Sequence, residues 1–152
     1  MALCEDLQAF CDAVNAAVDT TMLTDISNLA KSEISNTGRE NVYEAYTPRF
    51  NSRRGINGSG ILDITTMKDS YDYATKTLEI QSSAPFQHLW GGRYPHGHDL
   101  TDVVEQGNKN FNMGIAGPRP FYQYAEYSLE KTGSFDKTLE SGVNSKIAGR
   151  KF

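Results

Sequence analysis

The chain has 152 residues, the size of one domain, and can bury a continuous core without disulfides or a structural metal. Its formal net charge of −4 argues against a dedicated nucleic-acid-binding protein, which normally carries a basic face to displace counterions from phosphates. Hydrophobic residues make up only 38% of the chain, yet 8 Tyr and 7 Phe are many for this length, so we expect aromatic surface to be kept for neighbouring molecules.

Two helices are predicted in the first 46 residues, because apolar residues recur there at steps of three and four. The first is expected over residues 2–18 and to break at Asp19-Thr20-Thr21, which offers capping side chains. The second is expected to reach Tyr46, since the residue before Pro48 favours an extended backbone. The apolar positions are Leu3, Leu7, Phe10, Cys11, Val14 and Val18 in the first helix and Leu23, Ile26, Leu29, Ala30 and Ile34 in the second.

The N-terminal residues also indicate the compartment. Cys4 and Cys11 are separated by two helical turns, roughly 10 Å along the axis, which is too far for a disulfide. We expect free thiols in a reducing compartment. Glu5 and Asp6 stand where a signal peptide would be basic, and no apolar run of about 18 residues occurs, so assembly in a cytoplasm without a membrane span is expected.

Residues 47–59 have no apolar period and are rich in turn-forming residues, which predicts a loop or an extended arm. Arg49, Arg53 and Arg54 form the strongest local basic cluster of the chain. Two interpretations fit this pattern equally well, a solvated loop and a contact arm that grips an acidic neighbour.

Residues 60–84 predict a small antiparallel sheet, either a hairpin or a three-stranded meander. Thr75-Lys76 can turn the chain, and Leu78 and Ile80 then fall on one face of a strand. The helices are expected to cover that apolar face.

Residues 84–117 predict a long loop, because the glycines and prolines between Ala84 and His98 prevent a regular element. Only Asp99 to Gln106 fits a short helix or strand. Such a long loop in a compact domain is usually functional or ordered by a partner, and it holds Trp90, the single tryptophan.

A final helix is predicted from Pro118-Arg119-Pro120 onward, with a break at Gly133-Ser134. Beyond the break, apolar residues recur at steps of four between Phe135 and Ile147, and they suit packing within the subunit as well as docking onto a neighbour. The predicted class is therefore α+β, with N-terminal helices and a C-terminal helix on a small antiparallel sheet and long extended loops. Residues 1–133 are expected to form one domain and 134–152 a helical tail.

Several short motifs occur in one order between about residues 40 and 130. They are Val42-Tyr43-Glu44-Ala45-Tyr46-Thr47-Pro48, Arg53-Arg54-Gly55, Ala84-Pro85 with Leu89-Trp90-Gly91-Gly92, Val104-Glu105-Gln106-Gly107 and Ala116-Gly117-Pro118-Arg119-Pro120-Phe121. In these motifs the chain resembles the tail-completion or neck-protein family of long-tailed bacteriophages. It departs from that family at Gln106, where an aromatic residue is usual, and at Asn108, where threonine is usual.

The resemblance implies a structural virion protein that is not an enzyme and has no cofactor or metal. It implies a ring of six or more identical subunits in the phage neck, with a hexamer expected, between a head-side adaptor or head-closure protein and the tail terminator and tail tube. DNA would pass through the lumen without specific binding, and Asp and Glu side chains would face the channel. A tail terminator or a head-closure ring protein is the alternative within this class.

A ring is built from heterologous contacts, so one subunit must present an extended or aromatic element to a different surface of the next. Aromatic and arginine side chains supply most of the binding energy at such interfaces. The predicted interface residues are Arg49, Phe50, Arg53, Arg54, Phe86, Leu89, Trp90, Arg93, Tyr94, Arg119, Phe121 and Tyr122.

Two interpretations from other classes compete with the ring subunit. A metal-dependent enzyme could use His96-Gly97-His98-Asp99 with Glu105, although this spacing is not specific. A monomeric ligand-binding module could use an aromatic platform made of Trp90, Tyr94, Tyr122, Tyr124 and Tyr127.

Overall fold

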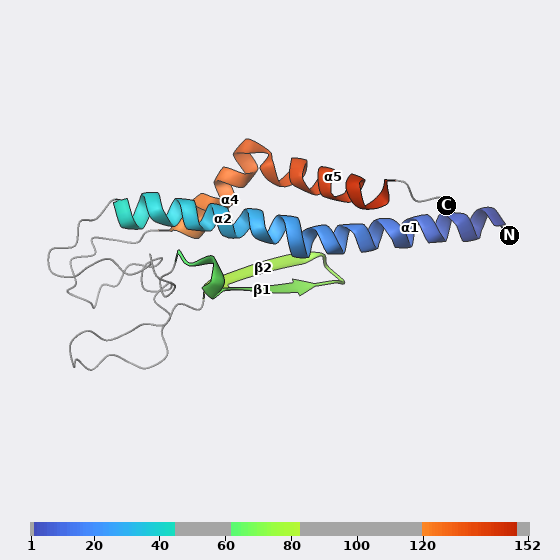
Figure 1. Cartoon of the computed structure of the whole chain (residues 1–152), viewed down its shortest axis with the longest axis horizontal. Coiled ribbons are helices and arrows are strands. Elements are labelled where there is room, and N and C mark those ends of the chain that lie inside the picture. Colours follow the sequence, from blue (N-terminus) through green and yellow to red (C-terminus); the bar gives the residue numbers. More distant parts are fainter. Residues whose placement is uncertain (1, 45–61, 83–119, 149–152) are drawn as a thin grey trace.

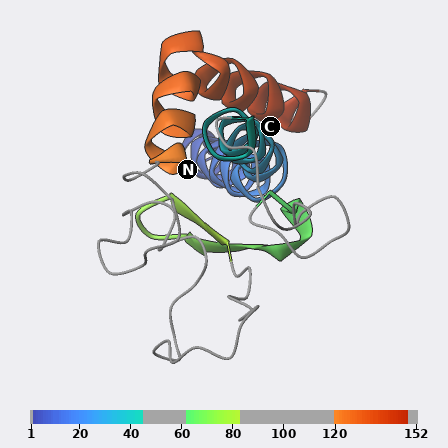
Figure 2. The same ribbon diagram turned by 90° about the vertical axis from the view of Figure 1, so that its left-hand side faces the viewer.

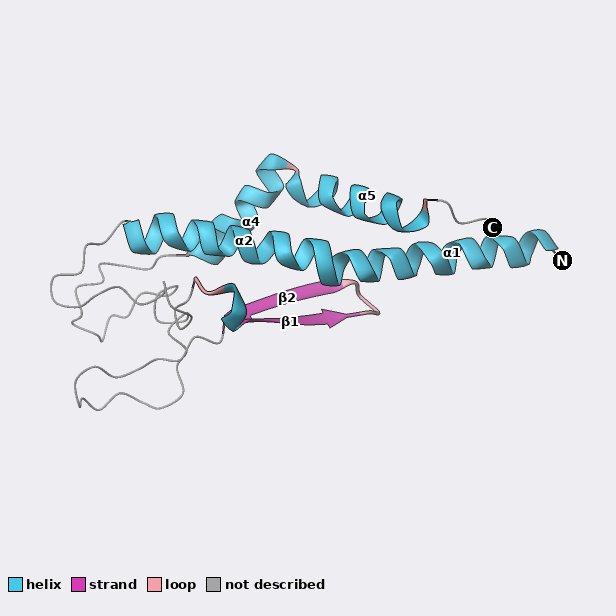
Figure 3. Ribbon diagram, viewed as in Figure 1, coloured by secondary structure: helices cyan, strands magenta, loops and turns pink. Residues whose placement is uncertain are grey.

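The computed structural model describes residues 2–44, 62–82 and 120–148 (Figure 1). The predicted α+β class is confirmed, with helices predominating over a small antiparallel sheet (Figure 3). The elements are α1 (Ala2–Thr21), a π-helical segment (Met22–Ile26), α2 (Ser27–Gly38), a second π-helical segment (Arg39–Glu44), a 3-10 turn (Ile64–Thr66), β1 (Met67–Asp72), β2 (Thr77–Ser82), α4 (Phe121–Thr132) and α5 (Ser134–Ile147).

Residues 2–44 form one continuous helix, so the predicted break at Asp19-Thr20-Thr21 is wrong. The hydroxyls of Thr20 and Thr21 donate to the carbonyls of Ala16 and Ala17, one turn back, and therefore do not cap a new helix. Thr21 itself has helical backbone angles. The helix reaches about 65 Å at 1.5 Å per residue.

The π-helical segment Met22–Ile26 shifts the apolar stripe between the two halves of this helix. A π turn accommodates an extra residue and so rotates the following side chains about the axis. Met22, Ile26 and Ile34 are buried, whereas Leu23, which a regular period would place on the same stripe, is 37% exposed.

The long helix lies between two other parts of the molecule. In Figure 1 the β-hairpin lies below it and the helical pair α4–α5 lies above it, and the view from its end in Figure 2 separates the same layers. α4 packs on α2, and α5 returns along α1. The turn between α4 and α5 is at Gly133, whose φ of 61° is a left-handed conformation that glycine adopts without strain. The predicted break at Gly133-Ser134 is therefore confirmed.

The hairpin has one face turned to the long helix, which includes the predicted Leu78 and Ile80, and one exposed polar face. Tyr71 pairs with Leu78 and Asp69 with Ile80, and this face meets the long helix. The opposite face carries the exposed pairs Lys68–Gln81, Ser70–Glu79 and Asp72–Thr77. Within the described ranges the sheet has these two strands, which corresponds to the hairpin of the two predicted forms.

The core lies at the α2 end of the long helix, where the hairpin and α4 meet. Ile34, Met67, Phe121 and Ala125 are buried together, and Phe121 is 0% exposed. The Thr37 hydroxyl donates to the Phe121 carbonyl at 3.0 Å and so links α2 to the start of α4. Burial of these side chains is the main apolar stabilisation of the fold.

The contact between α5 and α1 depends on close approach. A Cβ at Gly142 would lie 2.4 Å from Thr21 Cγ2, so only glycine fits without a shift of the helices. Ala13 and Ala17 of α1 are buried as well. None of the helices in the described ranges is long and apolar enough to cross a membrane.

A candidate binding groove

An open groove of about 660 Å³ lies between β2, the long helix and α4. Its floor is a row of side chains from Met22 to Ile34 at steps of four residues. Leu78 and Ile80 form one wall and Leu129 the other. The complete lining is Met22, Ile26, Ala30, Ile34, Lys76, Thr77, Leu78, Ile80, Tyr122, Gln123, Ala125, Glu126, Leu129, Glu130, Phe135 and Asp136.

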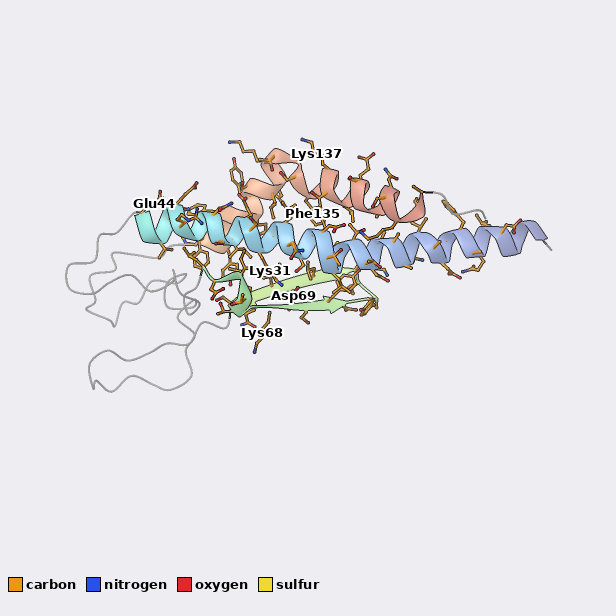
Figure 4. The ribbon with its side chains drawn as sticks, viewed as in Figure 1. Lys31, Glu44, Lys68, Asp69, Phe135 and Lys137 are labelled. Atoms are coloured by element: carbon orange, nitrogen blue, oxygen red, sulfur yellow. The ribbon has the colours of Figure 1, made fainter. Side chains whose placement is uncertain are left out.

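The groove exists because the hairpin and the α4–α5 pair lie on different sides of the long helix. Each of the two packs on that helix, and Tyr122 joins them at one end, where its hydroxyl accepts a hydrogen bond from the Ser82 amide at 2.9 Å. Phe135, at the start of α5, points toward the long helix and closes the other end (Figure 4). The lining is largely apolar, and its volume falls in the range of natural binding clefts.

The rim of the groove carries an excess of negative charge. Glu126 and Glu130 are one turn apart on α4, and Asp136 lies in the first turn of α5. Among the residues that the structure describes, none of these carboxylates has an ion pair. The single lysine of the lining, Lys76, is bonded to Asp19. The rim therefore favours a cationic group.

Asp19 fixes the hairpin turn to α1. Its carboxylate accepts from Lys76 Nζ at 2.6 Å and from the Tyr71 hydroxyl at 2.7 Å. These hydrogen bonds, that of Lys76 first, hold the pKa of Asp19 below its usual value. Burial, followed by the hydrogen bond to Asp19, raises the pKa of Tyr71 to about 12.

Asp69 fixes the hairpin to α2. Its carboxylate accepts from Lys31, with which it forms an ion pair, and from the buried hydroxyl of Ser27. Lys31 and Asp69 point toward each other across the gap between helix and strand (Figure 4). The hydrogen bond from Lys31, followed by that from Ser27, lowers the pKa of Asp69.

On the other side of the helix, Asp25 forms an ion pair with Lys146 of α5. It accepts from Lys146 Nζ at 2.7 Å, and this bond, together with a second from Thr24, lowers the pKa of Asp25. Asp19 and Asp69 thus hold the hairpin wall of the groove against the long helix, and Asp25 holds α5 against the same helix.

Exposed tyrosines lie on α4 near the groove. Tyr124 is 47% exposed and Tyr127 is 61% exposed, and the Lys131 ammonium lies 5.7 Å from the centre of the Tyr127 ring. Exposed tyrosines are frequent anchors of protein interfaces. Both were predicted as part of an aromatic platform, and both are accessible.

The structure describes two of the twelve predicted interface residues. Phe121 is fully buried inside the subunit, so it offers no surface to a neighbour. Tyr122 is half-buried and lines the groove. The other ten lie outside the described residues: Arg49, Phe50, Arg53, Arg54, Phe86, Leu89, Trp90, Arg93, Tyr94 and Arg119.

The predicted metal-binding alternative also falls outside the described residues, since it rests on His96, His98, Asp99 and Glu105. In the described part of the chain, no three His, Cys, Asp or Glu side chains are grouped as metal ligands. Cys11 is an exposed free thiol there.

The groove itself was not predicted from the sequence. Part of its floor could be predicted from the sequence, because Ile26, Ala30 and Ile34 belong to the predicted apolar stripe. The spacing of Glu126 and Glu130 would have placed both carboxylates on one helix face. Nothing in the sequence indicates that the strand and α4 leave a space between them.

The fold and this site define a small α+β protein built on one long helix, with an apolar groove and an acidic rim. A family model described as YomN matches residues 5–145, and the chain belongs to that family. The family is phage-associated, so this is a phage-associated protein. Neither the curated proteins nor the solved structures include a match to the chain.

Proposed function

We propose that this protein is a structural subunit of the phage neck, part of a ring that joins the head to the tail. The observation that carries the proposal is the open apolar groove with its acidic rim, which suits a segment of another protein chain. The phage-associated family supports the same role, as does the order along the sequence of the motifs between about residues 40 and 130.

In this role the protein is not an enzyme and uses no cofactor. Six identical subunits close a ring by heterologous contacts, in which an element of one subunit enters a different surface of the next. A head-side adaptor or head-closure protein binds one side of the ring, and the tail terminator and tube bind the other. The net charge of −4 per subunit lets DNA pass through the lumen without adhering.

The test is a phage that carries a nonsense codon in this gene, grown in non-suppressing and suppressing hosts and viewed by electron microscopy. Filled heads and separate tails of normal length are expected in the non-suppressing host. Purified protein added to that lysate should then restore joined, infectious particles. Intact virions without the protein would overturn the proposal.

The same experiment distinguishes the proposed role from the roles of the other neck proteins. Loss of a tail terminator lets the tube continue to polymerise, so overlong tails would indicate a terminator. Loss of a head-closure protein lets packaged DNA leak, so empty heads would indicate head closure.

A ligand-binding module is the second candidate, and the size of the groove favours it, because clefts of about 300 to 1,000 Å³ also hold small molecules. Light scattering of the purified protein, alone and mixed with its neck partners, distinguishes the two. A ring or a mixed complex supports the role of neck connector, whereas a monomer that binds none of these partners supports the ligand-binding module.

A further inference from the structure

The acidic rim of the groove has a counterpart in the sequence of the same chain. Three carboxylates, those of Glu126, Glu130 and Asp136, lie on the α4–α5 side of the groove without an ion pair among the described residues. Residues 47–61 contain three arginines and no acidic residue. The one lysine of the lining, Lys76, is paired with Asp19, so the rim keeps a net negative charge, whereas the segment lacks anions, and their charges are therefore complementary.

The apolar content of the two parts matches as well. Phe50 and Ile56 stand beside the arginines in the sequence, and the groove floor is built from Met22, Ile26 and Ile34. A segment that combines arginine with phenylalanine and isoleucine can pair its guanidinium groups with the rim and bury its apolar side chains on the floor. Arginine forms bidentate hydrogen bonds with carboxylates, which adds geometric specificity to the charge attraction.

The positions of the chain ends favour a neighbour as the source of this segment. The described helix ends at Glu44, and the chain is described again from Leu62, whose carbonyl accepts from the Ser35 hydroxyl at 3.0 Å. Both ends therefore lie beside the Ile34 and Tyr122 end of the groove, whereas Glu130 and Asp136 lie toward the end that Phe135 closes. A donor segment at one end and acceptor carboxylates toward the other make a head-to-tail contact.

We propose that the groove binds residues 49–56 of a second copy of this chain, with Arg53 and Arg54 against Glu126 and Glu130. This inference rests on the proposed ring and names the contact that closes it. Because donor and acceptor are different surfaces, each subunit gives one segment and receives one, and repetition of the contact gives a closed ring when the rotation between successive subunits closes.

The test uses two charge reversals in the full-length protein. Variant one carries Glu126→Lys and Glu130→Lys, and variant two carries Arg53→Glu and Arg54→Glu. Each alone places like charges against each other and should weaken self-association at least tenfold, measured by light scattering over a concentration series. Their equimolar mixture should assemble, because each groove then meets a segment of opposite charge. A chain that carries all four substitutions should assemble alone.

Matched controls reverse exposed charges elsewhere. Glu40→Lys with Glu140→Lys controls for the first variant, and Arg39→Glu with Lys137→Glu controls for the second. Both control proteins should assemble like the wild type. Lys137 points away from the long helix (Figure 4), so its reversal leaves the groove unchanged. Circular dichroism checks that every variant is folded, and Glu126→Gln with Glu130→Gln replaces the first variant if its lysines prevent folding.

A peptide of residues 47–59 gives a second readout that does not require a ring. It should bind the full-length protein, measured by fluorescence anisotropy, and Glu126→Lys with Glu130→Lys should weaken that binding at least tenfold. Peptide binding that is absent or indifferent to these substitutions overturns the inference, as does a mixture of the two charge-reversed variants that fails to assemble where the wild type does. A wild-type protein that stays monomeric with its neck partners overturns the ring itself, and the peptide still decides whether the groove takes this segment.

Discussion

The β-hairpin and the α4–α5 pair are attached to the long helix by different means. The hairpin is short, and two of the positions on its inner face, Asp69 and Tyr71, form hydrogen bonds to the helix. The helical pair has one ion pair to the helix, Lys146 with Asp25, but mainly inserts the fully buried Phe121 at one end and brings Gly142 close to Thr21 at the other.

The difference follows from the area that each element can bury. A six-residue strand turns only three side chains toward the helix, so apolar burial alone cannot fix its position, and charged hydrogen bonds orient it. The twelve residues of α4 and the fourteen of α5 offer a longer face, so the fit of their side chains against the long helix fixes their position. We therefore expect the helical side to respond mainly to changes of volume and the hairpin side mainly to changes of charge and pH.

The largest effect is expected for Phe121→Ala on the helical side. Phe121 is 0% exposed, and its removal leaves a cavity between α2 and α4. The free energy of unfolding should fall by about 3 to 5 kcal/mol, measured by urea denaturation. Tyr124→Ala, on the same helix but 47% exposed, is the matched control and should cost about 0.5 kcal/mol or less. Equal losses in the two variants would contradict the buried position.

The second effect concerns Gly142→Ala. In an open helix this change would stabilise by about 1 kcal/mol, but the new Cβ would lie 2.4 Å from Thr21 Cγ2. Because Thr21 is buried and β-branched, it cannot turn away, and we expect a net loss of about 1 to 2 kcal/mol. The neighbouring exposed change Ser141→Ala should be neutral or slightly stabilising in the same thermal unfolding measurement. A stabilising Gly142→Ala would show that α5 does not approach α1 this closely.

The third effect tests charge on the hairpin side through Asp69→Asn. The lowered pKa of Asp69 means that its ionised form stabilises the fold above pH about 4, and that this contribution is lost as the pH falls through the folded-state pKa. The variant should be less stable than the wild type at neutral pH by about 1 kcal/mol, since the pair is partly exposed. The two proteins should converge in acid. A constant difference at all pH values would mean that the charge of Asp69 has no part in the effect.

The smallest effect is expected for Tyr71→Phe, and it should appear at alkaline pH. The folded protein keeps the Tyr71 proton to about pH 12, whereas the unfolded chain releases it near pH 10, so the stability that this group contributes is lost between those values. The variant should be slightly less stable at neutral pH and should converge with the wild type toward pH 12. Tyr73→Phe, which is 60% exposed, is the control and should follow the wild type throughout. Absorbance titration of the phenolates gives an independent check on the late ionisation of Tyr71.

Much of the local structure could be predicted from the sequence, because it depends on neighbours along the chain. The alternation around Leu78 and Ile80 predicted the inner face of β2, and Pro120 and Gly133 predicted where α4 begins and ends. The predicted break at Asp19-Thr20-Thr21 was wrong because threonine occurs both as a helix cap and inside helices, so the residue type alone does not distinguish the two positions. Only the neighbouring backbone decides whether the hydroxyl bonds forward as a cap or back to a carbonyl.

The sequence by itself determined the class, the apolar stripe of the long helix and the hairpin, since these follow from periodicity and turn chemistry. The tertiary structure alone decided that Phe121 is core and not interface, that Gly142 must be small, and that β2 and α4 leave a groove whose rim holds Glu126 and Glu130. The physical reason is that burial and open space depend on which elements pack against one another. Residues that are distant in sequence set these contacts, and no local pattern encodes them.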